Sequence, residues 1–207
     1  MDKLNLKIRV ADIKDVELIL SLIGQKAEFD GCLDALEATA DKLRQTLFYS
    51  GLHPHEVHLR LCSGSINAAA IQTKPKGFPS LAGNPLYYHP PQAHVLLAEV
   101  EGIPVGFALY HYTYSSFLAQ QGIWLDDLFV QSHMRGKGIG QALIDSLAQI
   151  AAENNCGRIE WTVNKDNAPA IAFYKKQGAR IMESIRLCRI DRIGISRLAG
   201  KELAITP

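Results

Sequence analysis

Two cations alternate with glycines in the segment Arg135-Gly136-Lys137-Gly138-Ile139-Gly140. The segment follows an apolar run that predicts a strand, and it precedes a run with helical spacing that predicts a long helix. The first turn of a helix leaves backbone N–H groups unpaired, and the helix dipole adds partial positive charge there. Glycines let the backbone approach an anion closely, and Arg135 and Lys137 add full charges. The pattern therefore predicts a binding site for a diphosphate group.

Other glycine-rich phosphate motifs fit this segment less well. A dinucleotide-binding fold would have Gly-x-Gly-x-x-Gly after its first strand and an acidic residue about 20 positions later. A P-loop would have Ser or Thr after the lysine, whereas Gly138 follows Lys137. Considered alone, the segment is also compatible with a plain glycine-rich turn that binds nothing.

Two motifs, in the expected order and spacing, resemble the signature of the GNAT acetyltransferase superfamily. The first is Arg135 to Gly140, which matches Arg/Gln-x-x-Gly-x-Gly/Ala. The second is Asn167-Ala-Pro-Ala-Ile-Ala-Phe-Tyr174-Lys-Lys-Gln-Gly-Ala, which is similar to Asn-x-x-Ala-x-x-x-Tyr-x-x-x-Gly-Phe/Ala. The resemblance implies the GNAT acyl-CoA N-acyltransferase fold, an α/β fold with a mixed, mostly antiparallel sheet flanked by helices. It also implies acetyl-CoA as the acetyl donor.

A narrower resemblance, to the spermidine/spermine N-acetyltransferase branch, covers most of the chain outside residues 51–91. It rests on the runs Gly106–Tyr110, Thr113–Tyr114, Trp124–Val130 and Arg186–Asp191. The branch includes enzymes that act on diamines and others that act on thialysine or related amino acids. Its polyamine-acting members have Asp-Pro-Trp after the Thr-Tyr pair, whereas this chain has Ser115-Ser116-Phe117. This difference favours a shorter diamine or an amino acid with a side-chain amine.

An amine acceptor requires a base, because an alkyl amine with a pKa near 10.4 is almost fully protonated at neutral pH. A carboxylate can hold the ammonium and accept a proton from it, directly or through a water molecule. The resemblance assigns this role to Asp126, at a place where the family usually has Glu. Asp127 would point to the other face of a regular strand, but the resemblance implies a β-bulge that brings both carboxylates toward the substrate. The alternative for Asp127 is a structural carboxylate, paired with backbone or an arginine.

Further contacts are implied by the resemblance. Tyr174 takes the place of the general acid that protonates the leaving thiolate, with a core aromatic residue as the alternative. A backbone N–H near Leu128 or Phe129, freed by the bulge, would stabilise the reacting carbonyl oxygen. Phe29 and Asp30 lie where the family has an aromatic and an acidic residue beside the bound amine. Contacts with the donor are expected from Leu128, Phe129, Val130, Arg135, Gly136, Lys137, Gly138, Ile139, Gly140, Asn167 and Tyr174.

The elements that must position these residues follow from hydrophobic periodicity. Strands are predicted at residues 6–10, 94–100, 105–114, 124–130, 158–163 and 185–190, and helices at residues 12–27, 39–48, 138–154 and 167–177. Residues 51–91 contain six of the nine prolines and are predicted to be an insertion with a short hairpin at residues 57–61 and 68–72. We expect one domain over residues 1–207 that includes this insertion, which would cover the acceptor site or contribute to a dimer interface.

Composition and charge exclude several classes of function. The 207 residues carry a formal net charge of +1, so no global field attracts nucleic acid or anionic lipid. No apolar run approaches the ~20 residues of a membrane span, and the first residues do not resemble a secretion signal. The four cysteines form no Cys-x-x-Cys pair, which favours reduced thiols and a cytoplasmic location. His53, His55 and His58 have no cysteine partners, so no metal site is expected.

The expected partners are acetyl-CoA and a small-molecule primary amine, and the branch implies a homodimer. One alternative is an enzyme of the same fold that acetylates a protein at a lysine or at an N-terminus, which would need a groove open at both ends. Another is a non-catalytic acyl-CoA-binding sensor, which would need the segment from Arg135 to Gly140 but neither Asp126 nor Tyr174.

Overall fold

The computed structural model describes residues 4–48 and 91–200, which form two compact units. The first unit ends at Thr162 and the second begins at Val163. The hairpin predicted in the insertion and the three histidines lie outside the described residues. The expectation of a single domain that includes the insertion stays a prediction.

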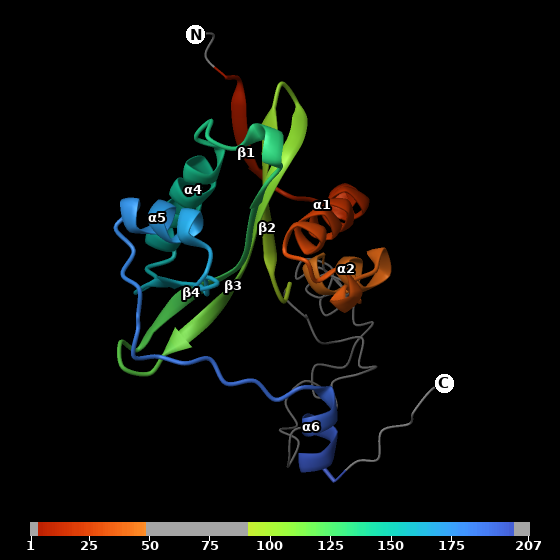
Figure 1. The fold of residues 1–207 in the computed structure, drawn as a ribbon, viewed down its shortest axis with the longest axis vertical. Coiled ribbons are helices and arrows are strands. Elements are labelled where there is room, and N and C mark those ends of the chain that lie inside the picture. Colours follow the sequence, from red (N-terminus) through yellow and green to blue (C-terminus); the bar gives the residue numbers. More distant parts are fainter. Residues whose placement is uncertain (1–3, 49–90, 201–207) are drawn as a thin grey trace, which may run out of the picture. The chain divides into compact units, whose positions relative to one another are not determined.

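Five strands form the sheet of the first unit, in the order β1-β2-β3-β4-β5. From β1 to β4 each strand is antiparallel to the next, and β5 is parallel to β4. Their bounds are Leu6–Val10, His94–Val100, Ile103–Ser115, Gln120–Val130 and Ile159–Glu160. The expected mixed, mostly antiparallel sheet is therefore confirmed (Figure 1).

Helices cover both faces of this sheet. Helices α1 (Val16–Phe29) and α2 (Ala40–Leu47) lie on one face, and α4 (Ile139–Glu153) lies on the other (Figure 1). Short 3-10 turns are found at Ile13–Asp15, Leu33–Ala35 and Ser132–Met134. No helix in the described residues has the length and apolar character needed to cross a membrane.

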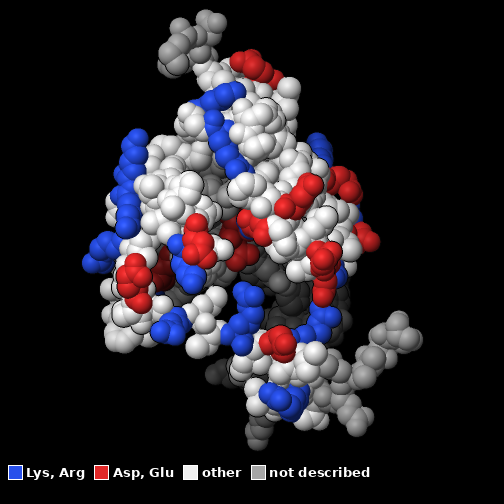
Figure 2. All heavy atoms as spheres, viewed as in Figure 1, with Lys and Arg blue, Asp and Glu red and all other residues white. Residues whose placement is uncertain are grey.

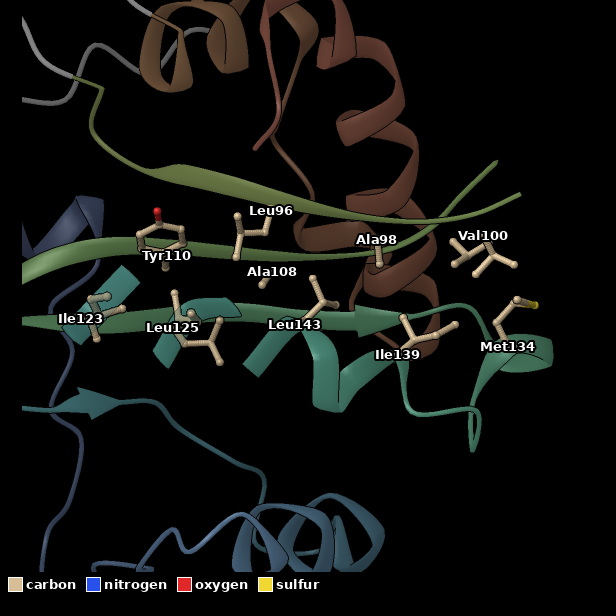
Figure 3. Close-up of a cluster of buried hydrophobic side chains, with 13 residues drawn as sticks. Leu96, Ala98, Val100, Ala108, Tyr110, Ile123, Leu125, Met134, Ile139 and Leu143 are labelled. Carbon is tan, nitrogen blue, oxygen red and sulfur yellow. The ribbon is translucent and has the colours of Figure 1, made fainter. Parts of the chain in front are cut away.

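Alternating side chains of the strands supply two cores, one on each face of the sheet. The core beneath α4 includes Leu96, Ala98, Ala108, Leu125, Ile139 and Leu143 (Figure 3). The core beneath α1 and α2 includes Ile19, Leu22, Val95, Leu97, Phe107 and Phe129. Complete burial of one such Leu, Ile or Phe side chain stabilises the fold by about 1.5–3 kcal/mol. The sheet is thus held from both sides, and the face toward which a side chain points decides which core it joins.

The start of α1 is tied to the sheet by Arg9 on β1. Its guanidinium donates two hydrogen bonds to the carboxylate of Asp15, at 2.6 and 2.8 Å, and one from Nε to Glu99 on β2, at 2.7 Å. Asp15 also accepts a hydrogen bond from the backbone N–H of Asp12, as part of a capping box. The hydrogen bonds from Arg9 lower the pKa of Asp15 and outweigh burial, which would raise it. Helix α1 therefore begins at a fixed point above β1 and β2.

The second unit contains helices α5 (Ala168–Lys176) and α6 (Arg192–Leu198). The helix predicted at residues 167–177 is confirmed, whereas the strand predicted at residues 185–190 is wrong. This segment alternates apolar and polar residues, but Ile185, Leu187 and Ile190 are 58–65% exposed. A strand also needs a hydrogen-bonded neighbour, and none of the described strands pairs with this segment. Helix α6 is absent from the sequence prediction.

Two strand boundaries also need correction. Strand β4 begins at Gln120 instead of residue 124, because the hairpin that it forms with β3 extends further. Strand β5 contains only Ile159 and Glu160 instead of residues 158–163, because its pairing with β4 ends there.

Asp15→Asn should lower the free energy of unfolding by about 2 kcal/mol at pH 7, because a charged partner of Arg9 is lost. The folded protein lowers the pKa of Asp15 below its ordinary value of 3.8. The stabilising contribution is therefore present above pH 3.8 and is lost as the pH falls through the lower, folded value. Urea unfolding should show a difference between wild type and variant that shrinks in acid. Asp41→Asn is the matched control, since Asp41 pairs with Arg44 at the exposed surface, and an equal loss there would contradict the assignment.

Candidate functional site

The loop between β4 and α4 has the backbone geometry of an anion-binding turn. Gly136 has a φ of +73°, and Gly138, the N-cap of α4, has a φ of +84°, values that residues with side chains rarely adopt. A Cβ added at either glycine would meet no described atom within 4 Å beyond the adjacent residues. The N-cap provides no side-chain acceptor, and the first turn of α4 has no acidic residue. The first N–H groups of α4, which no described side chain caps, can therefore bind an external anion.

The two cations of this loop are turned back onto the protein. Arg135 donates a hydrogen bond from Nε to the carbonyl oxygen of Val130, at 2.8 Å, and its guanidinium lies 4.0 Å from the centre of the Phe29 ring. Nζ of Lys137 lies 3.4 Å from Sδ of Met134. Arg135 therefore holds the loop against the end of β4 and the end of α1. A direct contact of either cation with an anion stays a prediction.

Phe29 and Arg135, which the sequence assigns to different ligands, lie in one pocket. The pocket has a volume of about 310 Å³ and is lined by Gln25, Glu28, Phe29, Phe129, Gln131, Ser132, His133 and Arg135. Nε2 of Gln131 donates a hydrogen bond to Oε1 of Gln25 at 3.0 Å and so joins the loop to α1. The end of α1 is thus in contact with the glycine-rich loop, and the expected contact between Phe29 and an amine stays a prediction.

Beyond Trp124, one edge of strand β4 has no neighbour among the described strands. It pairs with β5 only at Ile123 and Trp124, whereas its pairing with β3 continues to Val130. The side chains of residues 128–130 pack into the two cores, so these residues present only backbone groups at the open edge. An extended, amide-rich molecule can pair with such an edge as an added strand.

The register of β4 shifts by one residue at Asp126. Leu125 and Asp127 lie opposite adjacent residues of β3, so Asp126 has no partner there, and the expected β-bulge is confirmed. A one-residue shift exchanges the faces of all the residues that follow. Leu125 packs beneath α4, whereas Asp127 contacts α1 and Phe129 packs beneath α1. Without the bulge, regular alternation would place Asp127 and Phe129 on the α4 face.

The two carboxylates of the bulge have different surroundings. Asp126 is exposed, and its side chain forms no ion pair or hydrogen bond with any described residue. The side chain of Asp127 is 18% exposed, and its Oδ1 lies 2.9 Å from Nζ of Lys26. Burial raises the pKa of Asp127, the hydrogen bond from Lys26 opposes this, and the net direction is upward. The alternative of a structural role for Asp127 therefore involves a lysine partner instead of an arginine.

Lys26 is a site residue that the sequence analysis does not single out. Its Nζ lies 2.6 Å from Oδ2 of Asp30, in addition to its contact with Asp127. Burial would lower the pKa of Lys26, but the hydrogen bonds to the two carboxylates raise it above the ordinary value of 10.5. The i,i+4 spacing of Lys26 and Asp30 indicates this pair. The contact with Asp127 depends on the bulge and has no counterpart in the sequence pattern.

Asn167 and Tyr174 belong to the second unit. Oδ1 of Asn167 accepts a hydrogen bond from the backbone N–H of Ala170 at 3.2 Å and so caps α5. Tyr174 is buried, and its ring centre lies 5.2 Å from that of Phe173. Asn167 therefore stabilises the start of this helix, and the contacts of both residues with a donor stay predictions.

Charged and metal-binding groups elsewhere are scattered. Basic and acidic side chains are interspersed over the face that Figure 2 shows, and the formal net charge is +1. Within residues 4–48 and 91–200, no group of three or more His, Cys, Asp or Glu side chains could hold a metal ion.

Comparison with known protein families and curated proteins agrees with the motifs. Residues 66–179 match the model of the Acetyltransferase (GNAT) family. The chain is 30% identical to L-ornithine N5-acetyltransferase NATA1 of Arabidopsis thaliana over 200 residues, which cover 89% of this chain and 83% of that protein. It is 32% identical to the thialysine N-epsilon-acetyltransferase of Sus scrofa over 122 residues, which cover 54% of this chain and 71% of that protein.

Solved structures show the same fold. An integron cassette protein from the mobile metagenome of V. cholerae superposes with a TM-score of 0.62 at 23% identity, covering 95% of this chain and 99% of that chain. An aminoglycoside acetyltransferase from an uncultured soil sample, in complex with sisomicin, superposes with a TM-score of 0.61 at 15% identity, covering 90% and 95%. The likeness to these two chains concerns the fold alone.

Deletion of Asp126 should remove the bulge and shift the rest of β4 by one residue. Asp127 would then point into the core beneath α4, and the core beneath α1 would lose Phe129. The free energy of unfolding should fall by about 3 kcal/mol or more, which urea unfolding followed by circular dichroism measures. Asp126→Ala is the control, because it keeps the bulge and should stay within about 0.5 kcal/mol of wild type. Equal stability of the two variants would contradict the register argument.

Proposed function

This chain belongs to the GNAT acetyltransferase family, and we propose that it transfers the acetyl group of acetyl-CoA to a primary amine of a small molecule. The proposed acceptor is a diamine or polyamine, or an amino acid with a side-chain amine such as ornithine, lysine or thialysine. The names of the ornithine and thialysine acetyltransferases support an amino acid with a side-chain amine. The observation that carries the proposal is the unpaired carboxylate of Asp126, at a bulge beyond which β4 has no partner on its β5 side among the described strands.

The donor side of the proposed site is built from backbone groups. The N–H groups at the start of α4 would bind the diphosphate, because the glycines leave them uncovered by side chains. The open edge of β4 would pair with the amide-rich arm of acetyl-CoA. This edge runs from the glycine-rich loop back to Asp126, so a donor paired along it leads from the diphosphate to the carboxylate.

On the acceptor side, Asp126 would bind the ammonium and remove one proton, directly or through a water molecule. The neutral amine then has a lone pair with which to attack the thioester carbonyl. A backbone N–H of Leu128 or Phe129 would stabilise the negative charge that develops on the carbonyl oxygen. Tyr174 would give its proton to the thiolate that leaves when the C–S bond breaks, and the nitrogen, which carries one proton too many after the attack, would release it to the tyrosinate or to solvent. The proposed acceptor contacts also include Phe29 and Asp30.

Local charge supports a cationic acceptor. Asp30 and Asp126 lie close enough to Asp127 for their negative charges to raise its pKa, so three carboxylates gather here. Lys26 is the only cation of the described residues with an ion pair to any of them. The excess of negative charge would attract a protonated amine while the chain as a whole stays nearly neutral. A homodimer and a cytoplasmic location stay predictions.

Asp126→Asn should lower kcat/KM for an accepted amine by about 100-fold at pH 7, because a general base is lost. The loss should shrink toward pH 10, where more of the amine is already neutral. The measurement is release of CoA thiol from acetyl-CoA with a panel of diamines, polyamines and basic amino acids, from pH 7 to pH 10.

Asp145→Asn is the control for that series, because Asp145 is an exposed carboxylate on α4. If Asp126→Asn lowers kcat/KM by the same factor at every pH, Asp126 is not the general base. A wild-type protein that binds acetyl-CoA but acetylates no amine of the panel would overturn the small-molecule acceptor.

Gly138→Val should weaken acetyl-CoA binding by about tenfold or more, because loss of one or two hydrogen bonds to a charged group costs at least that factor. Isothermal titration calorimetry at a temperature where the variant is folded measures the affinity. Gly102→Val is the matched control, since Gly102 also has a positive φ, +78°, and also has open space around its Cβ. Both variants should lose about 1–3 kcal/mol of stability from backbone strain. Normal binding by Gly138→Val, or equal losses of affinity in both, would refute the diphosphate site.

A further inference from the structure

The half-buried carboxylate of the bulge, Asp127, is held by a cation of the protein itself. Nζ of Lys26 lies 2.6 Å from Asp30 and 2.9 Å from Asp127, and the side chains are 25%, 38% and 18% exposed in that order. An ammonium has three N–H donors, so two of them are used by these contacts. Asp126 directly precedes Asp127 in the chain, and its side chain has no ion-pair or hydrogen-bond partner among the described residues.

Three charged groups act on Asp127 in the described residues. Lys26 approaches it from α1, Asp30 from the C-cap of that helix, and Asp126 lies beside it on β4. The residue opposite it on β3 is the apolar Leu109. Two negative charges and one positive charge thus act on Asp127, and only the positive charge is in direct contact with it.

We propose that Lys26 is a positioning residue, which keeps Asp127 ionised and turned toward α1 so that Asp126 acts as an independent carboxylate base. This inference rests on the proposed role of Asp126. Two neighbouring carboxylates without a counter-ion cannot both ionise easily, and they titrate together as a pair that retains one proton to higher pH. With Lys26 in place, Asp127 has its own cation and does not need to share a proton with Asp126. The lysine therefore acts on the reaction through the two carboxylates and needs no contact with the acceptor.

The test is the pH dependence of kcat/KM in Lys26→Met, which removes the ammonium and keeps a side chain of similar length. The acid limb of the profile should move to higher pH by about one unit or more, because the uncompensated pair holds a proton. Lys26→Arg should restore the wild-type limb, because the cation returns. The double variant Lys26→Met/Asp127→Asn should also restore it, because the second negative charge is gone. Lys14→Met, an exposed lysine on the 3-10 turn before α1, is the control and should leave the limb unchanged.

A purely structural role would give a different result. If Lys26 only packed α1 against β4, removal of Asp127 as well would not restore the profile, and that outcome would overturn the inference. An unmoved acid limb in an active Lys26→Met variant would overturn it too. If wild type acetylates no amine, the proposed function fails, and the charge coupling is tested by stability alone.

Thermal unfolding supplies that second measurement, and it also applies if Lys26→Met folds poorly. Without Lys26, the folded protein should hold a proton on the pair that the unfolded chain releases. Stability relative to wild type should therefore rise as the pH falls from 8 to 5. In Lys26→Met/Asp127→Asn this pH dependence should disappear. A melting temperature of Lys26→Met that differs from wild type by the same amount at every pH would contradict the proposed coupling.

Discussion

The bulge at Asp126 is fixed by packing on both faces of the sheet. Leu125 is 2% exposed in the core beneath α4, and Phe129 is 6% exposed in the core beneath α1. Residues four positions apart in a regular strand point to the same face, so these two can be buried in opposite cores only if one extra residue lies between them. Burial of both side chains therefore stabilises the bulge. The same one-residue shift turns Asp127 toward α1 and leaves Asp126, on β4, without a partner on β3.

Helix α1 is the second element on which the arrangement depends, and it is attached at both ends. At its start, Arg9 binds Asp15 and the sheet residue Glu99. At its end, Phe29 lies against the guanidinium of Arg135 in the glycine-rich loop. Between these points Lys26 reaches the bulge. One helix thus connects the carboxylates to the backbone groups that form the predicted diphosphate site.

Local patterns in the sequence were sufficient for much of the fold. The hairpin of β2 and β3, helix α4 and the glycine-rich loop follow from periodicity and from the turn residues between them. The predicted strand at residues 185–190 is wrong because alternation reports the pattern of side chains and cannot show whether a partner strand is present. The same reason explains why β5 is shorter than predicted.

The candidate site was less accessible to sequence reasoning. The bulge was expected only from the family resemblance, since no local pattern around Asp126 distinguishes it from a regular strand. The ion pair of Lys26 with Asp127 depends on the bulge and on the docking of α1, both of which are tertiary features. The stacking of Arg135 on Phe29 joins residues that the motifs treat separately. Roles of Asn167 and Tyr174 beyond their helix still come from the resemblance.

The contact between Arg9 and Glu99 spans 90 positions of sequence and encloses residues 51–91. Closing a chain segment has an entropic cost that grows only with the logarithm of its length, so each doubling adds about 0.6 kcal/mol. Doubling or halving the length of chain between α2 and β2 therefore changes this cost by only about 0.6 kcal/mol. The length of chain between α2 and β2 can therefore vary widely during evolution while the bulge and its carboxylates keep their places.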